Sequence, residues 1–162
     1  MREEAQTLVL YSRSNEFARL EEFIENISDQ FNIGHTYFSN IIVALTELVK
    51  NAMLHGNQND SQKKVFVEFK QEEGNLKFSV TDQGSGFDFP IPQPSEMLTD
   101  LNIKNGLSIV YALSDGLEFE ENGRKITVIF NIAAANELLS KSRISALKQS
   151  GQTKEDKKKI HD

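Results

Sequence analysis

The chain has 162 residues, 38% of them hydrophobic, and a formal net charge of −6. This length and apolar content predict one folded domain with a single core. The negative charge disfavours nucleic acid as a partner, and the lack of cysteine excludes disulfides, thiolate catalysis and cysteine-ligated metals. We expect a cytoplasmic protein without a membrane span, because the first residues do not resemble a signal peptide and no stretch approaches about 18 apolar residues.

The first half of the chain predicts a strand, two helices and a hairpin. Residues 7–12, TLVLYS, are expected to form the strand. Apolar residues at helical spacing predict a first helix over about 14–31 and a second over about 36–55. Apolar and polar residues alternate in 63–71 and 75–82, on either side of the turn EEGN, which predicts a hairpin with one buried face.

The second half begins with a long loop. Residues 83–104 contain all three prolines and show neither the helix nor the strand period, so we expect a functional lid or a disordered segment. A third helix is predicted over about 105–114, and a second hairpin from 116–121 and 124–131. From Ala133 onward the chain is polar, with seven Lys or Arg against four Asp or Glu.

These elements predict an α+β fold. Four or five strands with one apolar face each, together with three helices, fit a two-layer α/β sandwich in which all helices cover one face of a mixed sheet. The folded domain is expected to span residues 1–132. Residues 133–162 are expected to form a polar tail, with a short helix over 133–148 and disorder towards the end.

The second predicted helix carries a carboxylate and an amide one turn apart. Glu47 and Asn51 are separated by four residues beside the apolar stripe, so both side chains project from one edge of the helix. An amide oxygen suits Mg²⁺, which prefers hard oxygen ligands. A carboxylate one turn earlier can accept the proton of a hydroxyl that attacks a metal-bound phosphate. The alternative is an ordinary solvated helix surface.

Asp82, Gly84 and Gly86 stand where the second strand of the first hairpin ends. A carboxylate followed by two residues without a Cβ can accept a hydrogen bond from a flat, amino-bearing ligand while the backbone approaches it closely. The same residue types are also typical of an ordinary turn, because Asp and Gly are common there. The pattern alone leaves both interpretations open.

Lys104, Asn105 and Gly106 open the third predicted helix. Unpaired backbone N–H groups at a helix start, with the charge of a lysine beside them, can hold anionic phosphates. Asn105 and Gly106 are equally suitable for an ordinary N-terminal cap. The pattern again allows a ligand site or a structural one.

Taken in order, E-x-x-x-N on a helix, D-x-G-x-G after a strand, a variable lid and a glycine opening the next helix resemble the GHKL ATPase superfamily. That superfamily includes histidine kinases, gyrase-type topoisomerases and heat-shock chaperones. The segments ELVKNAMLHGN, NQNDSQKKVFVEFKQEEGNLKFSVTDQGSGFD and NGLSIVYALSDGLEFEENGRKITVIF are similar to the anti-sigma factor serine/threonine-protein kinases. The resemblance covers about residues 7–132 and implies the Bergerat ATP-binding fold.

The resemblance also implies a role for each motif residue. Glu47 would be the general base, Asn51 the Mg²⁺ ligand, and Asp82 the partner of the adenine amino group. At the position of Lys104, some relatives have an arginine that faces the terminal phosphate. The other residues that would bind the nucleotide are Gly84, Gly86, Lys104, Asn105 and Gly106.

The implied function is that of an ATP- and Mg²⁺-dependent protein serine/threonine kinase of the anti-sigma partner-switching type. Its substrate would be a STAS-domain anti-sigma-factor antagonist. Phosphorylation adds about two negative charges to that protein and weakens the complex, which frees the kinase to sequester a sigma factor. Relatives often pair through the sheet or the first helix, so a homodimer is a further expectation.

One motif departs from the family pattern. Many relatives carry G-x-G-L-G-L in the loop that opens the third helix, whereas this chain lacks two of the three glycines and has Lys104 and Ser108 at usual glycine positions. The departure keeps open a non-catalytic ATP-binding switch that sequesters a regulatory partner. A third hypothesis is an interaction module that keeps the sandwich but no longer binds ATP.

Overall fold

The computed structural model describes residues 5–86, 93–96, 106–133 and 140–150. Contacts between Cα atoms divide the chain into two units, Met1–Phe130 and Asn131–Asp162. In the second unit, residues 140–150 form a helix with every side chain exposed, and part of the predicted helix over 133–148 lies outside the described residues. No described helix has both the length and the apolar composition needed to cross a bilayer.

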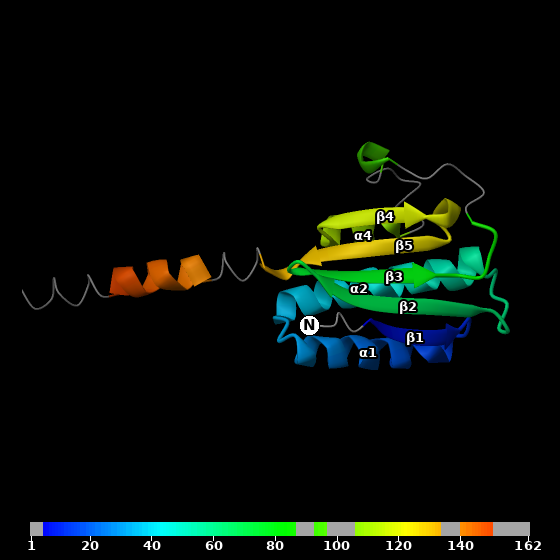
Figure 1. Ribbon diagram of the computed structural model, residues 1–162, viewed down its shortest axis with the longest axis horizontal. Coiled ribbons are helices and arrows are strands. Elements are labelled where there is room, and N and C mark those ends of the chain that lie inside the picture. The colour runs from blue at the N-terminus through cyan, green and yellow to red at the C-terminus, as the bar shows by residue number, and fades with distance from the viewer. Residues whose placement is uncertain (1–4, 87–92, 97–105, 134–139, 151–162) are drawn as a thin grey trace, which may run out of the picture. The chain divides into compact units, whose positions relative to one another are not determined.

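Five strands of the first unit form one sheet in the order β1-β2-β3-β5-β4 (Figure 1). Neighbours are antiparallel in the β1–β2, β2–β3 and β4–β5 pairs, and Figure 1 shows β5 running opposite to β3. The strands are β1 (Gln6–Tyr11), β2 (Lys64–Glu72), β3 (Asn75–Thr81), β4 (Gly116–Glu120) and β5 (Lys125–Asn131).

The sandwich is confirmed, but the expectation of a mixed sheet is wrong. For two consecutive strands to pair in parallel, a crossover connection must bring the second strand directly beside the first. Here the crossover after β3 carries β4 to the far edge of the sheet. The next strand, β5, then turns back between β4 and β3 and runs antiparallel to both.

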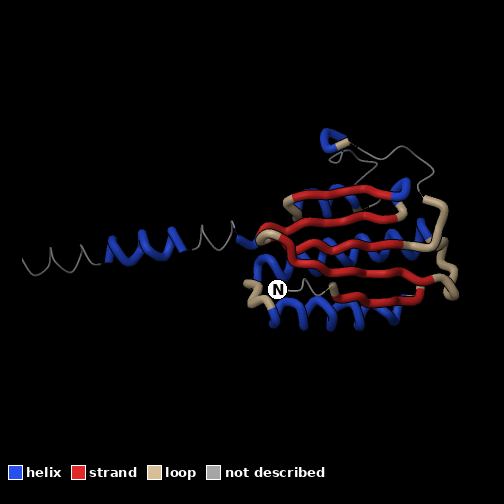
Figure 2. Tube along the Cα trace, viewed as in Figure 1, coloured by secondary structure: helices blue, strands red, loops and turns tan. Residues whose placement is uncertain are grey.

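Three α-helices lie against one face of this sheet (Figure 2). They are α1 (Phe17–Gln30), α2 (His35–Asn51) and α4 (Leu107–Leu113). Each has an apolar stripe at helical spacing, which packs on the apolar face of the strands. The buried side chains of the helices include Leu20, Ile24, Ile27, Ile41, Leu45, Leu48, Leu107 and Val110.

The strands supply the other half of the core through their alternation. Val65, Val67 and Phe69 of β2 are fully buried while their neighbours in sequence are less so, as the period of two requires. Phe69 and Phe78 lie with ring centroids 5.0 Å apart on adjacent strands. Rings in such tilted pairs add to the stability that burial provides.

The opposite face of the sheet carries polar side chains, and none of the described helices lies on it (Figure 2). Charged side chains face one another across strands, with Lys77 paired to Glu72 at 2.9 Å and Lys125 to Glu120 at 3.3 Å. Such exposed pairs contribute little stability. Buried polar groups, such as Asn57 and Asp82, lie instead between the helices and one end of the sheet.

Candidate functional site

Helix α2 ends in a π-helical turn, Ala52–Gly56. The Asn57 N–H bonds to the carbonyl of Ala52 at 2.8 Å, five residues earlier rather than four. Short π turns of this kind occur frequently at functional sites. This one sets the direction in which the chain leaves the helix towards the end of β3.

Asn57, directly after the π turn, is fully buried and satisfies its polar side chain inside the protein. Its amide nitrogen donates to Ser12 Oγ and to the carbonyl of Lys64, both at 2.9 Å. Its amide oxygen accepts the backbone N–H of Gln83 at 2.8 Å. One side chain thereby connects the end of the helix, the ends of two strands and the loop that follows Asp82.

Asp82 follows β3 and is only 8% exposed. Its Oδ1 accepts the N–H of Gly84 at 2.7 Å. A Cβ atom at Gly56 would overlap with the Asp82 carboxylate, and one at Gly84 would overlap with the carbonyl of Gly56. Both glycines are therefore required by the close approach of the chain to itself, which only a residue without a side chain allows.

Burial raises the pKa of the Asp82 carboxyl above its ordinary value, while the Gly84 N–H, Arg124 and Lys63 act in the opposite direction. A buried carboxylate that its surroundings compensate only in part costs folding free energy. Perturbed carboxyls of this kind concentrate at binding and catalytic sites. Its burial therefore makes Asp82 a candidate binding residue.

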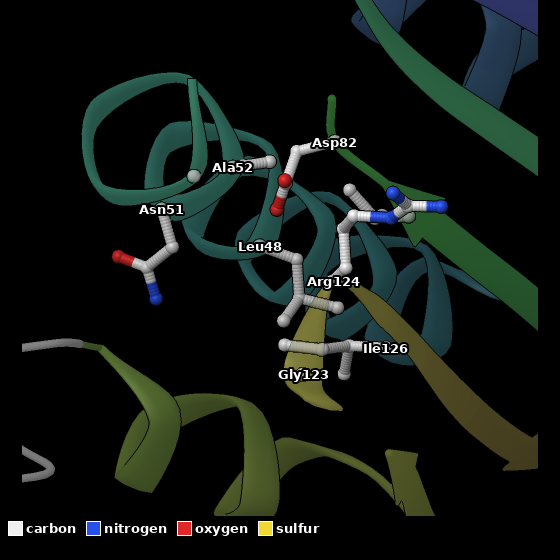
Figure 3. Close-up of a pocket in the computed structure, with 9 residues that line it drawn as sticks. Leu48, Asn51, Ala52, Asp82, Gly123, Arg124 and Ile126 are labelled. Atoms are coloured by element: carbon white, nitrogen blue, oxygen red, sulfur yellow. The ribbon is translucent and has the colours of Figure 1, made fainter. Parts of the chain in front are cut away.

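A pocket opens beside the Asp82 carboxylate, between α2 and the ends of β3 and β5 (Figure 3). Its walls combine apolar side chains with the Asp82 carboxylate, which suits a flat base that carries a hydrogen-bond donor. The pocket is partly open, and the space inside it is about 20 Å³, room for a single water. The lining residues are Leu48, Asn51, Ala52, Gly56, Val80, Asp82, Gly123, Arg124 and Ile126.

Glu47 faces the start of α4. Gly106, the residue before that helix, has a left-handed backbone with φ of 71°. A Cβ atom on it would overlap with the Glu47 carboxylate, so the carboxylate lies directly against the Gly106 Cα. Glycine is needed here both for the backbone angle and for the space. Helix α4 has seven residues, and Ser108 in its first turn is buried.

The structure brings most of the predicted site residues together. Asn51 ends α2 one turn after Glu47 and lines the same pocket as Asp82. Gly86, with φ of 91°, packs instead against Asn122, whose carbonyl oxygen would lie 2.7 Å from an added Cβ. Two predicted residues, Lys104 and Asn105, lie outside the described residues.

The acidic and histidine side chains of the described segments form no group of three that could hold a metal ion. A Mg²⁺ ion that enters with a nucleotide does not need such a group, because Mg²⁺ keeps several waters and takes its other ligands from phosphates. The Asn51 amide at the pocket edge fits that requirement. The donor set at the pocket edge is thus consistent with an ion that the nucleotide brings.

Sequence reasoning missed Gly56, Asn57 and Arg124. Gly56 and Asn57 stand just beyond the expected end of the second helix, and Arg124 opens the last expected strand. The sequence marks all three as lying near chain reversals. It does not show that these reversals meet at one pocket.

A known protein family and a solved structure are similar to this chain. Residues 12–130 match the family model of the histidine kinase-like ATPase domain. The chain is also similar to a crystal structure of the RsbU and RsbW domains of Rv1364c from Mycobacterium tuberculosis, with a TM-score of 0.55 and 18% identity over 78% of this chain. It spans 31% of that longer chain, and at this identity the likeness shows the fold alone.

No curated protein matches the chain. The family match nevertheless covers most of its length, from the end of β1 to β5, and it confirms the resemblance seen in the order of the motifs. The chain therefore belongs to the histidine kinase-like ATPase domain family.

Proposed function

We propose that the chain binds ATP with Mg²⁺ and transfers the terminal phosphoryl group to a serine or threonine hydroxyl of a STAS-domain anti-sigma-factor antagonist. Membership of an ATPase domain family supports ATP binding. The observation that carries the proposal is the contact of the Glu47 carboxylate with Gly106. This contact supports the proposal, because a carboxylate at the start of α4, one turn from the pocket residue Asn51, is suited to accept a proton there.

Asp82 recognises the base in this proposal. Its ionised carboxylate accepts a hydrogen bond from the base amino group, while apolar pocket side chains such as Leu48 and Ile126 exclude water. A hydrogen bond to a charged acceptor is among the stronger ones when water is excluded. Burial makes the negative charge of Asp82 unfavourable in the free protein, and in the complex the same charge strengthens the hydrogen bond to the base.

Asn51 and Glu47 act at the phosphate end. Asn51 would hold Mg²⁺ through its amide oxygen, and Glu47 would accept the proton of the attacking hydroxyl as the new O–P bond forms. Bound ATP supplies the phosphoryl group, and ADP leaves. The product carries about two additional negative charges at the contact with the kinase, which weakens that complex and frees the kinase to sequester a sigma factor.

The experiment is phosphoryl transfer from labelled ATP, with Mg²⁺, to STAS-domain proteins of the same organism. The expected result is phosphoserine or phosphothreonine on one of them, and its loss in the Glu47→Gln variant. Calorimetry with Mg·ATP is run in parallel. ATP binding without transfer to any STAS protein would overturn the kinase and leave a nucleotide-binding switch, whereas absence of ATP binding would leave an interaction module.

A further inference from the structure

We propose that Arg124, clamped by Glu121, is a positioning residue that makes the Asp82 pocket select a purine with an amino group at position 6 over one with a carbonyl there. This inference rests on the proposed function, because it concerns the base-binding end of the same site. It assigns a role to the turn between β4 and β5, which the motifs of the sequence do not include.

That turn is held in an unfavourable backbone conformation. Glu121, Asn122 and Gly123 all have left-handed angles, with φ of 51°, 56° and 84°. Left-handed residues other than glycine persist where the surrounding structure determines them. Here the Arg124 carbonyl accepts the Asp82 N–H at 3.1 Å, and Asn122 packs against the loop that follows Asp82. The turn is thus anchored to the Asp82 loop.

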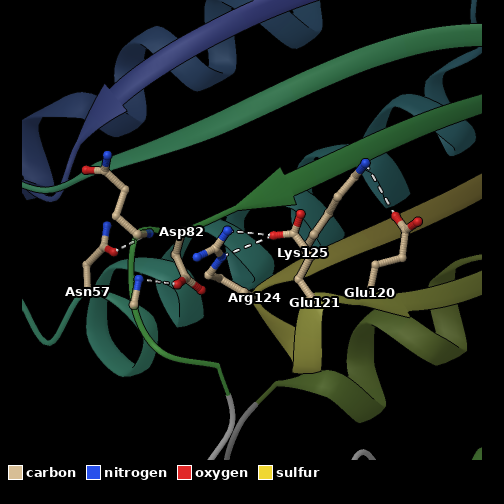
Figure 4. A network of polar contacts seen from close by, with 8 residues as sticks. Asn57, Asp82, Glu120, Glu121, Arg124 and Lys125 are labelled. Carbon is tan, nitrogen blue, oxygen red and sulfur yellow. Dashed lines mark hydrogen bonds and ion pairs between the residues drawn. The ribbon is translucent and has the colours of Figure 1, made fainter.

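The guanidinium of Arg124 is held within the same turn. Its Nε and Nη2 atoms donate to Glu121 Oε2 at 3.1 and 2.8 Å (Figure 4). Among the described side chains Arg124 forms an ion pair with Glu121 and none with Asp82. The residue lines the pocket while its charged end is turned to Glu121, which leaves the Asp82 carboxylate able to accept from a ligand.

Hydrogen-bond chemistry then separates two kinds of base. An ionised carboxylate only accepts and a guanidinium only donates. A 6-amino purine donates to Asp82 from its exocyclic nitrogen, whereas a 6-oxo purine presents an acceptor at that position, so the buried carboxylate loses the partner there. Released from Glu121, Arg124 could donate to the 6-oxo group and offset that loss. The clamp withholds this donor.

The charge of Arg124 has a second effect in the same direction. Burial raises the pKa of Asp82, and Arg124 and Lys63 oppose that rise. A protonated Asp82 can donate to a 6-oxo group, so keeping the carboxyl ionised favours the amino base. Sites built around a buried hydrogen bond reject the ligand that cannot make it.

The test compares the Kd values of Mg·ATP and Mg·ITP, whose bases differ at position 6 and in the proton that N1 of hypoxanthine carries. The wild type is expected to prefer ATP. Glu121→Gln should reduce that preference by about 3- to 5-fold, the range of a half-exposed ion pair, because it releases the Arg124 donor. Arg124→Met should reduce it because it removes the charge that helps to keep Asp82 ionised. The matched control is Glu120→Gln, which makes the same charge change and breaks the Lys125 pair on the open face of the sheet.

The outcomes separate this inference from the proposed function. If the wild type binds Mg·ATP and the ratio of the two Kd values is the same in all four proteins, the role of Arg124 is wrong and the proposed function stands. A uniform loss of affinity for both nucleotides in the variants would also overturn it, because a merely structural role predicts that pattern. If the wild type binds neither nucleotide, the proposed function is refuted and this inference with it.

Discussion

The side-chain oxygen of Asn57 accepts the backbone N–H of Gln83 at 2.8 Å, across 26 positions of sequence. The same amide group reaches Ser12 and the carbonyl of Lys64, and its residue is fully buried. The position of Asp82, next to Gln83, therefore depends on Asn57, the residue that follows the π turn after helix α2.

Asn57→Ala should lower the free energy of unfolding by about 2–4 kcal/mol, because it leaves the buried Ser12 hydroxyl and two part-buried backbone groups without their partner. Urea denaturation measures the change. Asn26→Ala, at an exposed position of α1, is the control and should change stability by less than about 1 kcal/mol. A loss as small as that of the control would show that water replaces the Asn57 amide.

Gly106→Ala should lower stability by about 1–2 kcal/mol, because a left-handed backbone is unfavourable for alanine. The added methyl group also displaces the Glu47 carboxylate, so the transfer rate should fall more than Mg·ATP affinity. Gly34→Ala is the control, since an added Cβ meets nothing within 4 Å there. Equal effects of the two substitutions would contradict the packing of Glu47 on Gly106.

Asp82→Asn should weaken nucleotide binding strongly without loss of stability at neutral pH. It removes a buried charge, and the asparagine oxygen can still accept the Gly84 N–H. Mg·ATP affinity is expected to fall by about 100-fold, the loss of one hydrogen bond to a charged group. The control is Asp60→Asn, whose Oδ1 likewise accepts an N–H two residues on, at an exposed position. Unchanged affinity in the Asp82 variant would refute base recognition by this carboxylate.

The pH dependence of stability should carry the signature of Asp82. Its folded pKa is raised above the ordinary value of 3.8, so between those two pKa values the folded chain binds more protons than the unfolded chain. The Asp82 contribution to the free energy of unfolding therefore falls as pH rises through that window and is constant above it. The stability of Asp82→Asn relative to the wild type, measured from about pH 4 upward, should rise and then level. A falling difference would mean that the pKa is lowered.

Glu47→Gln and Asn51→Ala should separate chemistry from binding. Loss of the general base is expected to slow phosphoryl transfer by about 10²–10⁴-fold while the Kd for Mg·ATP changes little. Asn51→Ala should instead weaken Mg·ATP binding, with a smaller effect on ATP measured without the metal. Rapid-quench transfer assays and calorimetry measure the two quantities. A Glu47→Gln variant with the wild-type rate would exclude this carboxylate as the base.

Much of the fold was predictable because local patterns and packing agree. The alternation through Val65, Val67 and Phe69 is also the alternation of burial in β2, and helix α2 begins and ends close to its expected bounds. The direction of β5 beside β3 was not predictable, since it depends on which strand the crossover reaches. That choice is made by contacts between distant parts of the chain.

The candidate site divides in the same way. Glu47 and Asn51 could be singled out because they stand one turn apart beside an apolar helix stripe, and Asp82 because two glycines follow it at the end of a strand. The contacts that hold these side chains in place could not be predicted from the sequence. The overlap of a Gly56 Cβ with Asp82 is a property of two segments that meet only in the folded protein, and no spacing in the sequence records it.

The π turn at Ala52–Gly56 also determines the length of chain that this site tolerates. Removing one residue from that segment would restore regular winding and rotate everything beyond it by about 100° around the helix axis. Gly56 would then leave the carboxylate it accommodates, and Asn57 would lose the loop that it holds. The extra residue thus acts as a spacer, and a homologue without it would need a different anchor for its base pocket.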